Sequence, residues 1–177
     1  MQSDKEFLLE KIEDAIRREA ENFVVNFSRE RTKGEGYRPS FSHFEVLYSG
    51  VLPLILPGDG EFTETRLHKN DILYLVPNAW VGRKADTERE LLVINLHEEG
   101  IECYFSHHMP GAPEGSSRRS YFTSSPLDAG GLHILKSFEH YSLANDTDMQ
   151  KAVFKVFLEL VKNSIEKDEG KSNAKTS

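Results

Sequence analysis

The side chains best suited to chemistry in this sequence lie at the two ends of a β-rich stretch. His43 and Glu45 are two residues apart near its beginning, and Asn95 and His97 are two residues apart near its end. Because successive side chains of a strand point to opposite faces, the members of each pair share one face of their strand. Polar groups placed in this way can converge on a small ligand at the mouth of a barrel.

Further candidates flank these two pairs in the sequence. Trp80 and Arg83 follow a strand break at Pro77, and an arginine precedes the first strand. An aromatic platform can stack on a sugar ring while charged side chains bond its hydroxyls. The predicted ligand-binding residues are Arg38, His43, Glu45, Tyr74, Trp80, Arg83, Asn95 and His97. In the alternative interpretation, His43 and Glu45 only satisfy each other and Trp80 plugs the end of the barrel.

The histidines do not have the spacing of a metal site. Metal-dependent barrels commonly present a His-x-His pair on one strand, followed by a carboxylate and a third histidine. The sequence keeps only His43 of such a pair, and residues 77–83 contain no histidine. The single cysteine, Cys103, lies in an apolar run, which favours a buried thiol over a nucleophile. We therefore predict no metal, no cofactor and no enzymatic activity.

Several elements must position these residues. Short β-rich runs separated by Gly-bearing turns, among them Gly58-Asp59-Gly60, predict a barrel over residues 37–105. Apolar residues at three- and four-residue spacing predict a helix over residues 4–27, within an N-terminal helix and turn at 1–36. Residues 106–131 are rich in Ser, Gly and Pro and predict a loop. We expect a helical hairpin over 132–166 and a linker-like tail over 167–177.

The last predicted helix is apolar on more than one side. A surface helix on a small barrel needs only one apolar side, so the additional width predicts contact with a partner subunit. The residues expected to form this homodimer contact are Val153, Val156, Phe157, Leu160 and Val161.

Composition limits the possible partners and location. The net charge of −7 argues against a general attraction of this chain to nucleic acid. The sequence shows no signal peptide and no run of about 20 apolar residues that could span a membrane. We expect a cytoplasmic protein without membrane contact.

Two segments of the sequence resemble the cupin domain of AraC-type transcription regulators. They are HFEVLYSG at residues 43–50 and LHKNDILYLVP at residues 67–77. The family has a Gly where Asn70 precedes Asp71 and a downstream His where Gly82 or Arg83 stands here. The resemblance covers about residues 37–105. It implies a mainly β fold with flanking helices, in which a cupin-type double-stranded β-helix (jelly-roll) barrel is followed by a C-terminal helical dimerisation element.

The resemblance also implies a function. In this family the domain binds a small-molecule effector, often a sugar, and pairs two subunits, while two helix-turn-helix units that follow it bind DNA. The chain is thus expected to be a truncated sensor that reaches DNA only through a domain not present here. Two alternatives remain open: a metal-free cupin enzyme, such as a sugar isomerase or epimerase using His97 with Tyr48 or Tyr74, and a stand-alone small-molecule-binding cupin.

Overall fold

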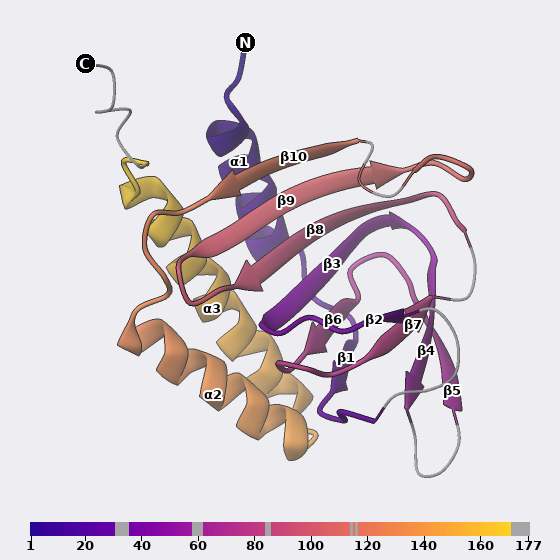
Figure 1. Ribbon diagram of the computed structural model, residues 1–177. Coiled ribbons are helices and arrows are strands. Elements are labelled where there is room, and N and C mark those ends of the chain that lie inside the picture. The colour runs from indigo at the N-terminus through magenta and orange to yellow at the C-terminus, as the bar shows by residue number, and fades with distance from the viewer. Residues whose placement is uncertain (31–35, 58–61, 84–85, 114, 116, 171–177) are drawn as a thin grey trace.

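The computed structural model describes residues 1–30, 36–57, 62–83, 86–113, 115 and 117–170 (Figure 1). The described residues form ten strands and three helices, which confirms a mainly β fold with flanking helices. In chain order these are α1 (Asp4–Arg17), β1 (Phe23–Asn26), β2 (Gly36–Tyr37), β3 (Ser42–Gly50), β4 (Leu52–Pro57), β5 (Phe62–Leu67), β6 (Ile72–Leu75), β7 (Val81–Arg83), β8 (Arg89–Leu96), β9 (Ile101–His108), β10 (Arg118–Phe122), α2 (Ala129–Leu143) and α3 (Thr147–Lys167).

The strands form two sheets with a leucine-rich core between them. The larger sheet has the order β1-β6-β3-β8-β9-β10, and the smaller one the order β2-β7-β4-β5. Neighbouring strands are antiparallel, except that β1 pairs in parallel with β6. Leu47 and Leu73 of the larger sheet and Leu54 and Leu67 of the smaller one belong to a single buried cluster. The two sheets therefore pack face to face.

The central strand β3 is buried on both of its faces. Seven successive residues of this strand, Ser42 to Tyr48, are buried. Phe44 and Val46 belong to the core beneath the helices, whereas Leu47 belongs to the core between the sheets. Alternate side chains of β3 therefore point either towards the helices or towards the smaller sheet. His43 and Glu45 point towards the smaller sheet, where they line a pocket.

The three helices cover the outer face of the larger sheet (Figure 1). Phe157 of α3 stacks on Phe44 of β3 with ring centroids 4.6 Å apart, and Phe138 of α2 lies 5.6 Å from the same ring. Aromatic contacts of this kind add to the free energy gained by burying the rings. The helical layer is therefore part of the core of this chain.

Strand β10 is tied to the ends of two helices. Arg119 donates a hydrogen bond of 2.7 Å to Asp4 at the start of α1. On the same face of the strand, the Tyr121 phenol donates to the carboxylate of Asp168, which also accepts hydrogen bonds from the backbone and hydroxyl of Ser124. Asp168 caps the C-terminal end of α3. One edge strand thus contacts both the first and the last helix.

The helix predicted over residues 4–27 is wrong beyond Arg17. A capping box between Ser3 and Glu6 starts the helix at Asp4. The helix ends at Arg17, and the chain then continues into strand β1. The run Phe-Val-Val at residues 23–25 is aromatic and β-branched, which favours a strand. Pairing with β6 decides the outcome, because the Ile72 amide donates to the Asn22 carbonyl at 2.9 Å.

The loop predicted over residues 106–131 is also wrong over much of its length. Strand β9 continues to His108, residues 118–122 pair with it as β10, and α2 begins at Ala129. The sheets therefore extend beyond the predicted barrel limits of 37–105 at both ends. The helical hairpin predicted over 132–166 is confirmed with slightly wider bounds. The predicted turn at 58–60 and residues 171–177 of the predicted tail lie outside the described residues.

No helix in the described part of the chain combines the length and the apolar character needed to cross a membrane.

Replacing Phe157 by alanine should destabilise the fold strongly, because the ring is fully buried against Phe44. Large-to-small changes of this kind cost about 3–5 kcal/mol in the free energy of unfolding. Urea denaturation followed by circular dichroism measures the loss. The exposed Glu159→Ala on the same helix is the control and should change stability by less than about 0.5 kcal/mol. A loss below about 1 kcal/mol for Phe157→Ala would contradict the packing of α3 on β3.

Candidate functional site

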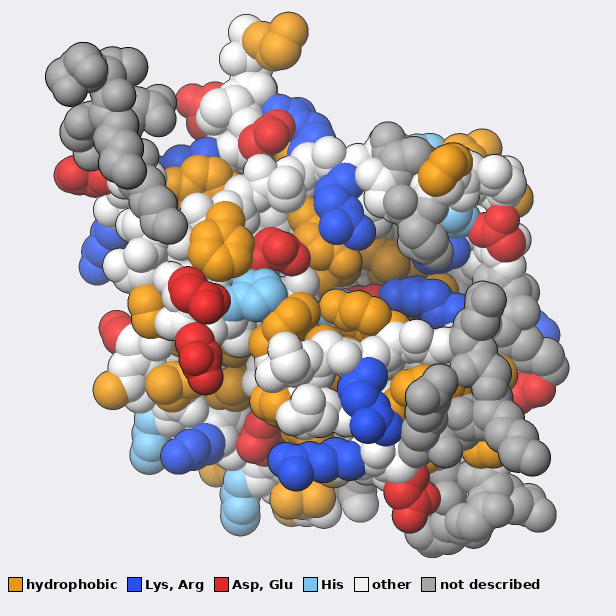
Figure 2. Space-filling model, viewed as in Figure 1, with side chains coloured by type: hydrophobic (Ala, Val, Ile, Leu, Met, Phe, Trp, Pro, Cys, Tyr) orange, Lys and Arg blue, Asp and Glu red, His pale blue; other side chains and the backbone are white. Residues whose placement is uncertain are grey.

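An open pocket of about 680 Å³ lies between the two sheets. Figure 2 shows a hollow on this face that is bordered by hydrophobic, basic and acidic side chains. Strands of both sheets contribute to its walls. The lining residues are Gly36, Tyr37, Phe41, His43, Glu45, Arg83, Asn95, His97, Glu102, Tyr104 and Arg118.

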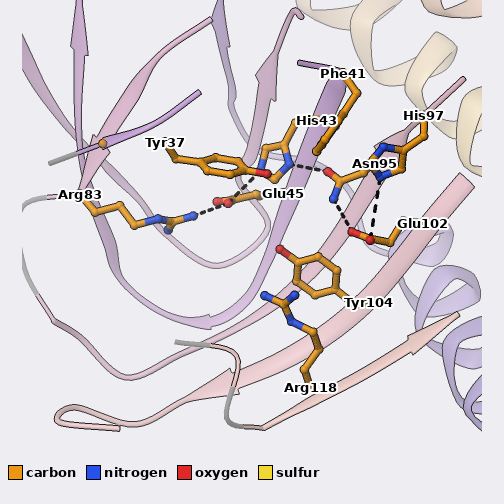
Figure 3. A pocket seen from close by; sticks show the side chains of 11 residues that line it. Tyr37, Phe41, His43, Glu45, Arg83, Asn95, His97, Glu102, Tyr104 and Arg118 are labelled. Carbon is orange, nitrogen blue, oxygen red and sulfur yellow. Dashed lines mark hydrogen bonds and ion pairs between the residues drawn. The ribbon is translucent and has the colours of Figure 1, made fainter. Parts of the chain in front are cut away.

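A continuous series of polar contacts crosses the floor of this pocket (Figure 3). Arg83 forms an ion pair with Glu45 Oε1, and His43 Nε2 lies 3.0 Å from the same oxygen. On its other side, His43 Nδ1 lies 2.5 Å from the Asn95 side-chain oxygen, while the Asn95 amide donates to Glu102 at 2.7 Å. His43 thus faces an acceptor at each ring nitrogen.

The Glu45 carboxylate is buried in the floor, with only 1% of its side chain exposed. Burial by itself raises its pKa, but the Arg83 guanidinium and the contact with His43 outweigh this effect and lower the pKa to about 2. The group is therefore ionised at neutral pH. Its second oxygen, Oε2, has no hydrogen-bond partner among the described residues. A donor supplied by a ligand would satisfy this oxygen, which is costly to leave unpaired.

Two tyrosines line the pocket above this floor. Burial, reinforced by the negative charge of Glu45, raises the pKa of both Tyr37 and Tyr104. Their hydroxyls therefore stay protonated at neutral pH and can donate hydrogen bonds. The Arg118 guanidinium lies over the Tyr104 ring, with its central carbon 3.8 Å from the ring centroid. Rings and hydrogen-bonding groups thus alternate around the opening.

Five of the eight predicted ligand-binding residues come together in this pocket. They are His43, Glu45, Arg83, Asn95 and His97. Both members of each predicted pair line the pocket, as expected for residues that share a strand face. The two pairs come together because β3 and β8 are neighbours and His43 lies directly opposite Asn95. The structure thereby joins two sequence signals that are about fifty residues apart.

The other three predicted residues lie elsewhere. Arg38 is exposed and donates to the Arg29 carbonyl at 2.8 Å, so its assignment to the pocket is wrong. Tyr74 is also wrongly assigned, because its side chain lies on the helix-covered face of the larger sheet and stacks on Phe44. Its hydroxyl donates to Glu139 of α2.

Trp80 fills a space behind the pocket and does not line it. The indole is 3% exposed and packs so closely on Gly36 and Gly82 that a Cβ atom there would lie 2.2 Å and 2.6 Å from the ring. The alternative interpretation, in which Trp80 acts as a plug, is the one that the structure supports.

Six of the lining residues were not among those predicted from the sequence. They are Gly36, Tyr37, Phe41, Glu102, Tyr104 and Arg118. Glu102 and Tyr104 carried a usable signal, because they alternate with buried Cys103 and Phe105 at the two-residue period of a strand. No sequence signal pointed to Arg118, because it lies in the segment that was predicted to be a loop.

Among the described residues, no group of three or more His, Cys, Asp and Glu side chains is arranged to hold a metal ion. In the pocket, both ring nitrogens of His43 and one oxygen of Glu45 already have partners. Cys103 is fully buried beneath the helices, and burial raises the pKa of its thiol, which makes it a poor nucleophile. The absence of a metal or cofactor stays a prediction.

Fold and site together define a class of protein. It is a two-sheet, mainly β protein with helices on one face and an open polar pocket between the sheets. No protein-family model matches the chain, and neither curated proteins nor solved structures give a match.

The Glu45→Gln variant should show what the buried charge contributes to stability. A carboxyl with a pKa lowered from 4.5 to about 2 stabilises the fold above pH about 4.5, and this contribution is lost as the pH falls towards 2. The wild type should therefore exceed Glu45→Gln in free energy of unfolding at neutral pH, and the difference should shrink between pH 4.5 and 2. Urea denaturation across this range, with exposed Glu159→Gln as the control, measures it. A difference independent of pH would contradict the ion pair.

Proposed function

We propose that this chain is the ligand-sensing and dimerisation domain of an AraC-type transcription regulator, built on a cupin-type barrel. It binds a small molecule, a sugar or a related metabolite, in the pocket between the sheets. The observation that carries the proposal is the buried Glu45 Oε2, an ionised oxygen without a partner among the described residues at the floor of an open pocket. In this role DNA is bound by a separate domain, since a chain of net charge −7 has no general attraction for it.

The pocket has the features that a polyhydroxylated ligand needs. Hydroxyls both donate and accept, so they match the acceptor on Glu45 and the protonated phenols of Tyr37 and Tyr104. The rings of these tyrosines and of Phe41 offer flat apolar surfaces for the C–H face of a sugar. The volume of about 680 Å³ lies within the usual range for small-molecule sites.

The dimerisation part of the proposal depends on α3, which carries two apolar stripes. Phe157 and Val161 are fully buried within this chain, so their predicted place in a dimer contact is wrong. A second stripe lies beside the buried one, with its members at alternating spacings of four and three residues. It consists of Met149, Val153, Val156 and Leu160, all half-buried or exposed.

Alternation of three and four residues is the spacing of a coiled-coil seam. Met149 and Val156 are 37% and 47% exposed, which is unusual for apolar side chains at such regular positions. We therefore propose that two copies of this chain pair through this seam, in which Val153, Val156 and Leu160 keep their predicted roles.

Introducing charge into the seam should dissociate the dimer without unfolding the chain. The Val156→Glu variant should sediment as a monomer of about 20 kDa while keeping the circular dichroism spectrum of the wild type. Thr63→Glu, an exposed position in the smaller sheet, makes the same charge change away from the helices and should stay dimeric. A dimeric Val156→Glu variant would rule out this seam.

The second candidate function is a metal-free enzyme acting on a sugar. The observation that favours it is the His43–Glu45 contact in the same pocket as two phenols, which are groups that can move protons. The raised pKa values of Tyr37 and Tyr104 weigh against it, because a tyrosine base needs a lowered pKa. Binding is therefore the function that the geometry supports best.

The pairing of His97 with Tyr48 or Tyr74 as acid and base is wrong. Both tyrosines lie on the helix-covered face of the larger sheet, whereas His97 lines the pocket on the other side. The Tyr48 hydroxyl donates to the Lys11 carbonyl of α1 and is not available to a ligand in the pocket.

A panel of monosaccharides and their derivatives, titrated calorimetrically, tests binding. The best ligand should bind about 10- to 100-fold more weakly to Glu45→Gln, the usual loss for a hydrogen bond to a charged group. Arg38→Gln, at an exposed position outside the pocket, should leave affinity unchanged. NMR spectra of the ligand after prolonged incubation should show no conversion. Conversion would establish the enzyme, and the absence of any ligand for the wild type would overturn the proposal.

A further inference from the structure

The charged groups that line the pocket are not all paired with one another. Arg83 is paired with Glu45. Glu102 accepts a hydrogen bond from Asn95 and lies 3.9 Å from the His97 ring nitrogen, too far for a hydrogen bond. The Arg118 guanidinium, in contrast, forms no ion pair or hydrogen bond with another described residue, and its contact is the face of the Tyr104 ring.

The arginine at the rim is the cation that a ligand can reach. Arg83 and Arg118 line the pocket together with the carboxylates of Glu45 and Glu102. Arg83 is paired with Glu45, whereas Arg118 forms no ion pair with another described residue. A ligand carrying a negative charge would pair with Arg118, whereas a cationic ligand would be repelled by it.

The position of Arg118 suits it to hold a carboxylate. It is the first residue of β10, paired opposite Ser106 of β9, so its backbone is fixed at the rim of the pocket. Figure 3 shows its guanidinium beside the Tyr104 ring, with the phenol hydroxyl pointing on towards Glu45. Stacking on the ring orients the planar group and leaves its N–H edge for two parallel hydrogen bonds to a carboxylate.

We propose that the ligand is a small hydroxylated monocarboxylate of the sugar-acid class. Its carboxylate binds Arg118 at the rim, and one of its hydroxyls donates to Glu45 Oε2 at the floor. The unpaired Glu45 Oε2 and the Arg118 guanidinium, which has no ion pair or hydrogen bond with another described residue, are then both satisfied by one molecule. This inference rests on the proposed ligand-binding function and narrows its ligand from sugars in general to their acids. A second carboxylate on the ligand is disfavoured, because the Glu102 carboxylate also lines the pocket.

Matched pairs of ligands test the inference by calorimetry at 0.15 M salt, about physiological ionic strength. Suitable pairs are D-galactose with D-galacturonate and D-glucose with D-gluconate and D-glucuronate. One acid should bind at least about tenfold more tightly than its neutral partner, the gain expected for a charge-assisted contact. The fluorescence of Trp80, the single tryptophan, is a second readout, because its indole packs on Gly36 in the pocket wall.

Variants of β10 provide the controls. Arg118→Gln should remove the preference for the acid, with a loss of about 10- to 100-fold for the acid and little change for the neutral sugar. Arg118→Lys should restore part of it, since it keeps the charge but not the planar fork. Arg119→Gln removes the neighbouring charge on the opposite face, where it contacts Asp4, and should leave the preference intact.

Two outcomes overturn the inference and are distinguishable from each other. If neutral sugars bind as tightly as their acids and Arg118→Gln has no effect, the ligand is not an anion and the proposed function stands. If no member of either class binds to folded wild-type protein at millimolar concentration, both the inference and the sugar-binding function are wrong.

Discussion

The burial of the Glu45 carboxylate constrains much of the structure around it. An ionised group in the interior is tolerated only when opposite charge and hydrogen bonds surround it. Here the compensation comes from Arg83 on β7 of the smaller sheet and from His43 on β3 of the larger one. The same contacts that stabilise the charge therefore determine how the two sheets meet at the pocket. Asn95 and Glu102 extend the network to β8 and β9.

The pocket and the helical layer are joined through a single strand. Glu45 faces the pocket, and its neighbour Phe44 stacks on Phe157 of α3. Interiors are densely packed, so a displacement of β3 cannot be confined to one of its faces. In the proposed function, this ring contact connects the strand that carries the ligand site to the helix that carries the exposed seam.

Much of the fold and about half of the site were predictable from the sequence. The two-residue period of strands correctly placed His43 with Glu45 and Asn95 with His97. The error at Tyr74 arose because the face that a strand turns inward depends on its register, here Phe44 opposite Tyr74, and a run of apolar residues does not specify it. Arg118 was missed because an edge strand, buried little, can have the composition of a loop.

The same limitation explains the dimer prediction. The sequence showed that the last helix has more apolar surface than one contact requires, but it could not show which stripe is used internally. The aromatic stripe with Phe157 fits the aromatic face of β3, and the aliphatic stripe with Val156 is left outside. Complementarity of shape in the folded core decides between two stripes that a helical wheel treats as equivalent.

The attachment of β10 has a mechanical consequence. This strand has one neighbouring strand, β9, and its free side is not supported by the sheet. Asp168, directly after α3, holds Tyr121 near one end of β10, while Arg118 occupies the other end. A force that pulls on the end of α3 is therefore transmitted through a few hydrogen bonds to an edge strand that can peel from its sheet. The end of the last helix and the Arg118 wall of the pocket are thus linked mechanically through one edge strand.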